Sequence, residues 1–117
     1  MQLTHWPADS DEPTVLASEV EVADTLVSQA RGLMFRRSIP SDYALAFRFG
    51  RPRTRGVHMV FVPFPIDVIW ASDGVVGRVS QLRPWVGIGR HEADLLVELS
   101  AGAASDVTPG DRIDLCE

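Results

Sequence analysis

Arginine is the residue type whose clustering suggests the most chemistry in this sequence. Four arginines lie within eight residues and three more lie near a predicted helix end: Arg48, Arg51, Arg53 and Arg55, then Arg31, Arg36 and Arg37. A guanidinium group binds a carboxylate or phosphate through parallel hydrogen bonds. The cluster favours a small anionic ligand; the alternative is that these arginines pair with acids on the surface.

His58 and Asp67 form the second set with possible chemistry. They are nine residues apart across a proline-containing turn, and we expect them on neighbouring strands, where the carboxylate can orient the imidazole. Such a pair suits general acid–base catalysis, or a metal site if His91 and Glu92 lie nearby. The alternative is that Asp67 braces the turn and His58 is an ordinary half-buried strand residue. No tight metal-ligand or phosphate-binding motif is present, so we expect neither a metal nor a cofactor.

Composition narrows the class of protein. The chain has 117 residues and a net charge of −5, and all eleven basic residues are arginine. The absence of lysine and asparagine indicates GC-rich coding or a halophilic, salt-rich cytoplasm. The acidic balance disfavours nucleic acid as a partner. No apolar run approaches the roughly 20 residues of a membrane span, and the first residues do not resemble a signal peptide, so we expect a soluble cytoplasmic protein with no membrane partner.

The apolar pattern predicts mostly short strands. We expect a loose polar tail over residues 1–13, with His5 in solvent, followed by one compact domain over residues 14–117. The one expected helix covers Asp24–Met34. Asp73-Gly74 between two apolar runs is a strong hairpin signal. The expected strands are Thr14–Val22, Tyr43–Phe49, Val57–Val62, Ile66–Ala71, Val75–Leu82, Ala93–Leu99 and Arg112–Cys116.

These elements predict an all-β fold with minor α content. About seven short strands at near-regular spacing are typical of a β-sandwich, jelly-roll or barrel with one helix at an edge. An edge strand ending at Cys116 would permit a weak homodimer, and a monomer is the alternative.

Several sequence blocks also occur together, and in the same order, in a known family. The string Ala30–Arg36, the run Pro65–Ile69, the segment Leu96–Gly102 and the turn Pro109–Asp111 resemble the blocks of domain-of-unknown-function family 192. The resemblance covers roughly residues 23–115. It implies a compact, mostly β domain of sandwich or jelly-roll type, and it implies no particular reaction.

Three functions from different classes follow. The first is a binding module, in which the arginine-rich loop Gly50–Gly56, the helix end Gly32–Arg37 and the loop Pro84–Glu92 gather at one end and hold a small anionic ligand or a protein. Trp85 and His91 lie in the last of these loops. The second is a hydrolase-type or metal-assisted enzyme that uses His58 and Asp67. The third is a structural accessory domain. The fold class does not choose among them.

Overall fold

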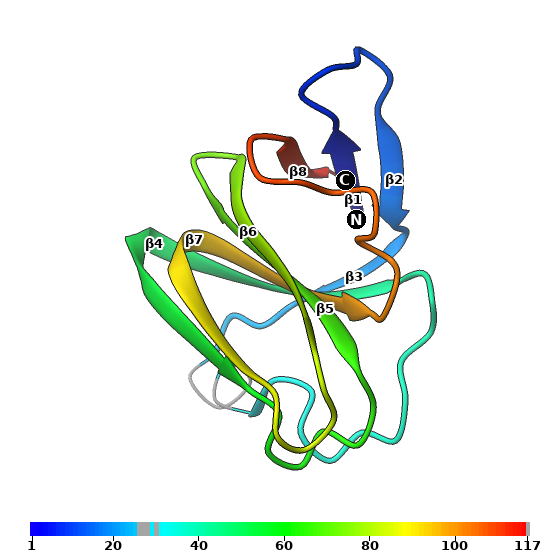
Figure 1. The fold of residues 1–117 in the computed structure, drawn as a ribbon, viewed down its shortest axis with the longest axis vertical. Helices are drawn as coiled ribbons and strands as arrows, with labels where there is room; N and C mark the ends of the chain where they lie inside the picture. The colour runs from blue at the N-terminus through cyan, green and yellow to red at the C-terminus, as the bar shows by residue number, and fades with distance from the viewer. Residues whose placement is uncertain (26–28, 30, 117) are drawn as a thin grey trace.

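A single curled sheet forms the molecule in the computed structural model, which describes residues 1–25, 29 and 31–116. Among these described residues the sheet has eight strands in the order β2-β1-β8-β6-β5-β7-β4-β3, and only the β3–β4 pair is parallel (Figure 1). The strands are β1 Gln2–Trp6, β2 Thr14–Ala17, β3 Glu19–Val22, β4 Tyr43–His58, β5 Ile66–Ser72, β6 Val75–Leu82, β7 Ile88–Ser100 and β8 Arg112–Cys116. The all-β prediction is confirmed, but there is one sheet where a sandwich, jelly roll or barrel was expected.

Two apolar clusters lie on opposite faces of the central strands. Along β5, Val68 and Trp70 belong to one cluster, and Ile69 and Ala71 to the other. Because both faces are covered, every residue of β5 up to Ala71 is buried. The faces of β4 divide as the alternation predicts, with Leu45 and Phe47 in the first cluster and two alanines in the second.

The β5–β6 hairpin forms where the sequence places it. Ser72 pairs with Val75 across Asp73-Gly74, and both turn residues have positive φ, 52° and 81°. Such a two-residue turn matches the right-handed twist of the strands it joins.

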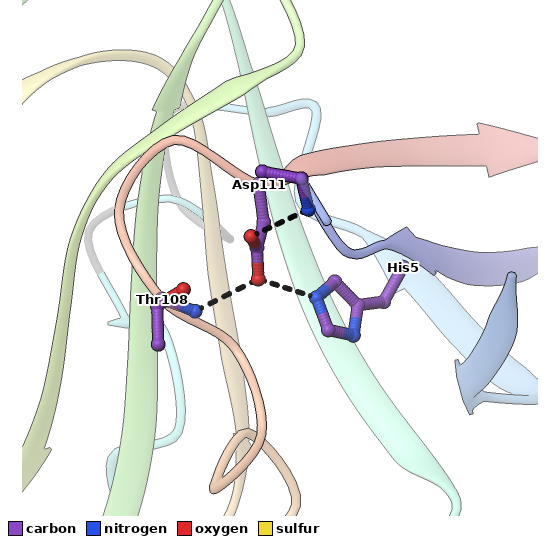
Figure 2. A network of polar contacts seen from close by, with 4 residues as sticks. His5, Thr108 and Asp111 are labelled. Atoms are coloured by element: carbon purple, nitrogen blue, oxygen red, sulfur yellow. Dashed lines mark hydrogen bonds and ion pairs between the residues drawn. The ribbon is translucent and has the colours of Figure 1, made fainter. Parts of the chain in front are cut away.

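The N-terminal segment is ordered, so the expectation of a loose tail is wrong for its first half. Gln2–Trp6 forms β1 between β2 and β8, and His5 is buried. Figure 2 shows the reason: His5 Nε2 lies 2.8 Å from Asp111 Oδ2, which also accepts the Thr108 N–H at 3.0 Å. The Ala8 N–H donates to the other oxygen at 2.9 Å. One carboxylate thus joins the two ends of the chain.

Two further predictions, about which strands are continuous and which lie at the edges of the sheet, are wrong. The single strand expected over Thr14–Val22 breaks at Ser18 into β2 and β3, which lie at opposite edges of the sheet. The backbone N–H groups of Ser18 and Glu19 both donate to the Asp42 carbonyl, which turns the chain there. The strand ending at Cys116 is β8, which lies inside the sheet, so the exposed edges are β2 and β3.

Strand β4 contains a sharp bend where a loop was expected. Phe49–Pro52 lie opposite Asp94 alone, and pairing with β7 resumes at Arg53 and continues to His58. The extra residues bend the long β4–β7 ribbon, as Figure 1 shows, in the manner of a large β-bulge. The whole of the expected loop Gly50–Gly56 is therefore strand, and the expected loop Pro84–Glu92 ends in the first residues of β7.

Of the helix predicted over Asp24–Met34, residues 26–28 and 30 lie outside the described residues, and Gly32–Met34 form a turn. At its start, the Gln29 N–H donates to the Thr25 carbonyl at 2.9 Å.

Candidate functional site

A cleft of about 410 Å³ lies between the bent β4–β7 ribbon and residues 29 and 31–34. This volume is within the usual range for small-ligand sites. Its polar lining includes Gln29, Arg31, Arg55, His58 and Glu98. Its apolar lining is Leu33, Met34, Phe47, Phe49, Val57, Val62, Ile66 and Leu96.

Glu98 is the unusual group of this cleft. Its side chain is buried on the same face of β7 as Leu96, and its Oε1 has no hydrogen-bond partner within the described part of the chain. Burial raises the pKa of Glu98 to about 7, and the positive charge of Arg36 only partly opposes this rise. An unpartnered buried polar group is uncommon in a native protein and calls for an explanation. Glu98 also lines the open cleft, so a ligand bound there would lie beside its carboxyl group.

Arg55 is held rigidly beside the cleft. Its guanidinium carbon lies 3.7 Å from the centre of the Phe49 ring, its Nε donates to the Ala93 carbonyl, and one Nη2 bond goes to the Arg51 carbonyl. Among the described residues, Nη1 makes no hydrogen bond, so part of the fork remains open to a ligand. Because the other bonds fix the side chain, binding there would cost little further side-chain entropy.

The other predicted arginines do not converge on the cleft as a group. Arg31 lines it and is exposed, with Nε 3.4 Å from the Met34 carbonyl oxygen. Arg36 turns away to the Tyr43 hydroxyl, 3.0 Å, and to Glu21, 3.4 Å. Arg51 and Arg53 are exposed at the bend of β4, outside the lining.

The expected contact between His58 and Asp67 does not form. Their strands, β4 and β5, are separated by β7. Asp67 is buried on the other face, where its carboxylate accepts hydrogen bonds from Gln81 Nε2 and from the backbone N–H groups of Gly102 and Ala104. His58 lines the cleft alone, and its Nδ1 accepts the Val60 N–H at 3.3 Å. Asp67 thus braces the turn that follows β7, whereas the alternative interpretation had it brace the proline turn before β5 and made His58 half-buried; His58 is exposed.

The remaining predicted site residues lie apart from the cleft. His91 is exposed with Nδ1 3.1 Å from the Glu92 carbonyl oxygen, and its ring packs against Gly77. Trp85 is exposed in the turn before β7, where its N–H donates to the Val62 carbonyl. Within the described ranges, no three His, Cys, Asp or Glu side chains gather closely enough to hold a metal ion.

Sequence reasoning missed Glu98 because it treated β7 as a strand with one exposed face. On that assumption Leu95, Val97 and Leu99 point inward and Glu98 points to solvent. The available signal is the acid inside the apolar run Ala93–Leu99, since such runs are typical of strands that are covered on both faces.

Comparison with known proteins identifies the family. The model of DUF192, described as "Uncharacterized ACR, COG1430", matches residues 8–115. The chain belongs to the DUF192 family. A UPF0127 protein of Pyrococcus horikoshii is 33% identical in an alignment 102 residues long, which covers 81% of this chain and 85% of that protein.

Two crystal structures have the same fold as this DUF192 chain. One is a "putative transcription regulator" from Sinorhizobium meliloti 1021, with a TM-score of 0.82 and 26% identity over 97% of this chain and 92% of that one. The other is a protein of unknown function from Novosphingobium aromaticivorans, with a TM-score of 0.81 and 22% identity over 98% and 84% of the two chains. Within the described residues, no helix is both long enough and apolar enough to cross a bilayer.

Proposed function

We propose that the protein is a binding module for a small organic anion that also carries a hydroxyl or amino group. The apolar body of the ligand occupies the cleft between β4, β7 and residues 31–34. Its anionic group is held by Arg55 and Arg31. Its hydroxyl or amino group donates to Glu98.

The observation that carries this proposal is the buried Glu98 Oε1, which has no partner in the described chain and belongs to a residue that lines an open cleft. Leaving a buried acceptor unpaired costs about 1 to 3 kcal/mol or more when it is charged. A donor on the ligand removes that cost on binding. Arg55 supports the anionic end, because a fixed guanidinium recognises carboxylates and phosphates with defined geometry.

A thermal-shift screen tests the proposal with hydroxy acids, amino acids, sugar phosphates and simple carboxylates as probes. A ligand that binds only the folded state raises Tm by mass action. We expect at least one hydroxy or amino acid to raise Tm by several degrees. Failure of every organic anion to shift Tm would contradict the proposal.

Three variants separate the roles of the cleft residues. Glu98→Leu removes both charge and acceptor and should abolish the shift, whereas Glu98→Gln keeps an acceptor and should retain part of it for a hydroxyl ligand. Arg55→Ala should weaken binding of the anionic group. Arg53→Ala is the matched control, because it is an arginine of the same strand outside the cleft, and it should leave the shift unchanged.

One observation favours a second candidate function, acid–base catalysis. A carboxyl group whose pKa is raised to about 7 by burial is suited to give and take protons near neutral pH. In this second function, Glu98 takes the acid–base role that the sequence suggested for His58 and Asp67. Incubation of any ligand from the screen, followed by mass spectrometry, distinguishes the two functions: conversion that Glu98→Gln abolishes indicates an enzyme, and recovery of unchanged ligand indicates a binding module.

A further inference from the structure

Six large apolar side chains are exposed together at one end of the molecule; we call this group the apolar tip. Phe35 and Phe61 stack with ring centroids 4.9 Å apart, and the Phe35 N–H donates to the Phe61 carbonyl. The members of the apolar tip are Phe35, Val60, Phe61, Trp85, Val86 and Ile88, with exposed fractions from 47% to 77%. None of them lines the cleft, so the tip stands apart from the proposed ligand site.

Three loops build the apolar tip and hold one another in place. Besides the bond between Phe35 and Phe61, Trp85 N–H donates to the Val62 carbonyl and Met59 N–H donates to the Gly87 carbonyl. Figure 1 shows these loops together at the lower end of the long axis. The tip is therefore the extreme end of an elongated molecule, whose extents are 38, 28 and 25 Å.

The backbone at the apolar tip is strained in a way that keeps aromatic groups outward. Phe35, Phe61 and Trp85 have φ of 69°, 59° and 68°, a left-handed conformation that costs a residue with a side chain about 1 to 2 kcal/mol. Glycine or asparagine would adopt it at less cost. Bulky aromatic residues at three such positions are not explained by stability, and strain of this kind is characteristic of functional surfaces.

The charge around the apolar tip is opposite to that of the whole chain. Residues 31–41, 58–66 and 83–91 contain no Asp or Glu, although the net charge of the protein is −5. The same segments contain exposed arginines, namely Arg31, Arg37, Arg83 and Arg90. The tip thus combines projecting apolar groups with a predominantly cationic rim, in which Arg36 is paired with Glu21.

We propose that the apolar tip docks peripherally on an anionic membrane surface. Aromatic side chains favour the boundary between headgroups and acyl chains, and each basic residue near an anionic leaflet adds roughly 1 kcal/mol of attraction. Tip-to-tip pairing of two copies would bring the cationic rims together and is disfavoured. A lipid surface is also favoured over a protein because the tip is a projecting end formed by three loops, with few groups that could specify one partner. This docking departs from the expectation of no membrane partner, which rested on the lack of an apolar run long enough to span a bilayer.

Sedimentation with vesicles tests this proposal, with phosphatidylglycerol and phosphatidylcholine vesicles as the two probes. The wild type should sediment with phosphatidylglycerol, less so as salt is raised, and much less with phosphatidylcholine. The variant Phe61→Asn/Trp85→Asn should reduce the bound fraction at least about tenfold, since two aromatic groups no longer enter the interface. Asparagine tolerates positive φ, so this variant should fold, and its melting curve verifies that it does.

Two more variants complete the experiment. Trp6→Asn removes an exposed tryptophan of β1, outside the apolar tip, and should leave vesicle binding unchanged. Trp85→Phe keeps an apolar ring and should still sediment, but the blue shift of tryptophan fluorescence on binding should disappear, because Trp70 is already buried and Trp6 lies outside the apolar tip.

Three outcomes would overturn the proposal. The wild type does not bind phosphatidylglycerol vesicles; or the Phe61→Asn/Trp85→Asn variant binds them as the wild type does; or the wild type self-associates through the tip, as measured by light scattering, without binding vesicles. The last result would assign the apolar tip to a protein interface.

Discussion

Asp111 and Glu98 are both buried carboxyl groups on this sheet, and their surroundings are opposite. The oxygens of Asp111 accept hydrogen bonds from His5, Ala8 and Thr108, whereas Glu98 Oε1 accepts none among the described residues. Burial raises the pKa of Asp111, but the bonds from His5, Thr108 and Ala8 outweigh it and lower the pKa to about 2. Burial without such bonds raises the pKa of Glu98 to about 7.

The difference separates a structural group from a group available to a ligand. Asp111 carries the contacts that join β1 to the turn before β8, and its charge is fully used within the protein. Because Asp111 is ionised and can only accept, His5 Nε2 must carry the proton of their bond. Glu98 contributes no such stabilising bond through Oε1 and lowers stability when ionised. Residues that cost stability and lie in a cleft are the ones expected to serve function.

The largest expected effect comes from removing the satisfied carboxylate. Asp111→Ala should lower the free energy of unfolding by about 3 to 5 kcal/mol, since the buried His5 ring and two partly buried backbone N–H groups lose their acceptor. Denaturant unfolding measures this. Asp106→Asn, an exposed acid on the loop before β8, is the control and should change stability by about 0.5 kcal/mol or less. A similarly small loss for Asp111→Ala would mean that the network in Figure 2 does not anchor β1.

Removing the charge of Glu98, which has no hydrogen bond at Oε1 within the described residues, should stabilise the protein near neutral pH. The folded-state pKa of Glu98 lies above its ordinary value of 4.5, so its contribution favours folding fully below about pH 4.5 and is lost as pH rises to 7. The loss amounts to about 3 kcal/mol. Glu98→Gln should abolish this pH dependence, which unfolding curves at pH 5 and pH 8 measure. If stability falls equally from pH 5 to pH 8 in the wild type and in Glu98→Gln, the raised pKa of Glu98 is contradicted.

Asp111 governs a different pH window. Its folded-state pKa lies below the ordinary value of 3.8, so its stabilisation is present above about pH 4 and is lost as pH falls toward 2. The difference between wild type and Asp111→Asn should amount to about 2 kcal/mol of pH-dependent stability. Acid unfolding followed by circular dichroism checks this. If the variant unfolds at the same acidic pH as the wild type, the charge of Asp111 does not stabilise the folded protein.

Asp67 is a third buried carboxylate, and it accepts hydrogen bonds within the protein as Asp111 does. Its three hydrogen bonds predict that Asp67→Asn costs about 1 to 2 kcal/mol. Because β7 separates Asp67 from His58, a double-mutant cycle between Asp67→Asn and His58→Ala should give a coupling energy below about 0.5 kcal/mol. A larger coupling would restore the acid–base pair that the sequence suggested.

The smallest effect concerns the strained backbone of the apolar tip. Phe61→Asn loses the stacking with Phe35 but relieves the cost of positive φ, so the two terms should cancel to within about 1 kcal/mol. Denaturant unfolding compares this variant with Phe47→Ala, a core change that should cost about 3 to 5 kcal/mol. A large loss for Phe61→Asn would mean that Phe61 supports the fold.

The local signals of the sequence predicted much of the sheet, and long-range contacts decided the rest. The Asp73-Gly74 hairpin and the two faces of β4 follow from turn chemistry and alternation. The order of β1 could not be predicted, because His5 is buried only through Asp111 at the far end of the chain. Arg51 and Arg53 seemed to form a loop because the bulge that keeps their segment in β4 depends on pairing with β7.

The cleft was predicted only in part for the same reason. Arg31 and Arg55, predicted as ligand-binding residues, and His58, predicted as a catalytic residue, line the cleft. Glu98 required knowing that β7 is covered on both faces. A polar residue in a strand is assigned to solvent by alternation alone, and only the position of that strand inside the sheet reverses the assignment.

Carbon-13 NMR titration of the side-chain carboxyl groups is the most direct test of the contrast between Glu98 and Asp111. The structure predicts that Glu98 titrates with a pKa of about 7 and that Asp111 titrates with a pKa of about 2. A Glu98 carboxyl that titrates near its ordinary value of 4.5 would show that it is hydrated or already paired, and the cleft would lose the group on which its proposed function rests.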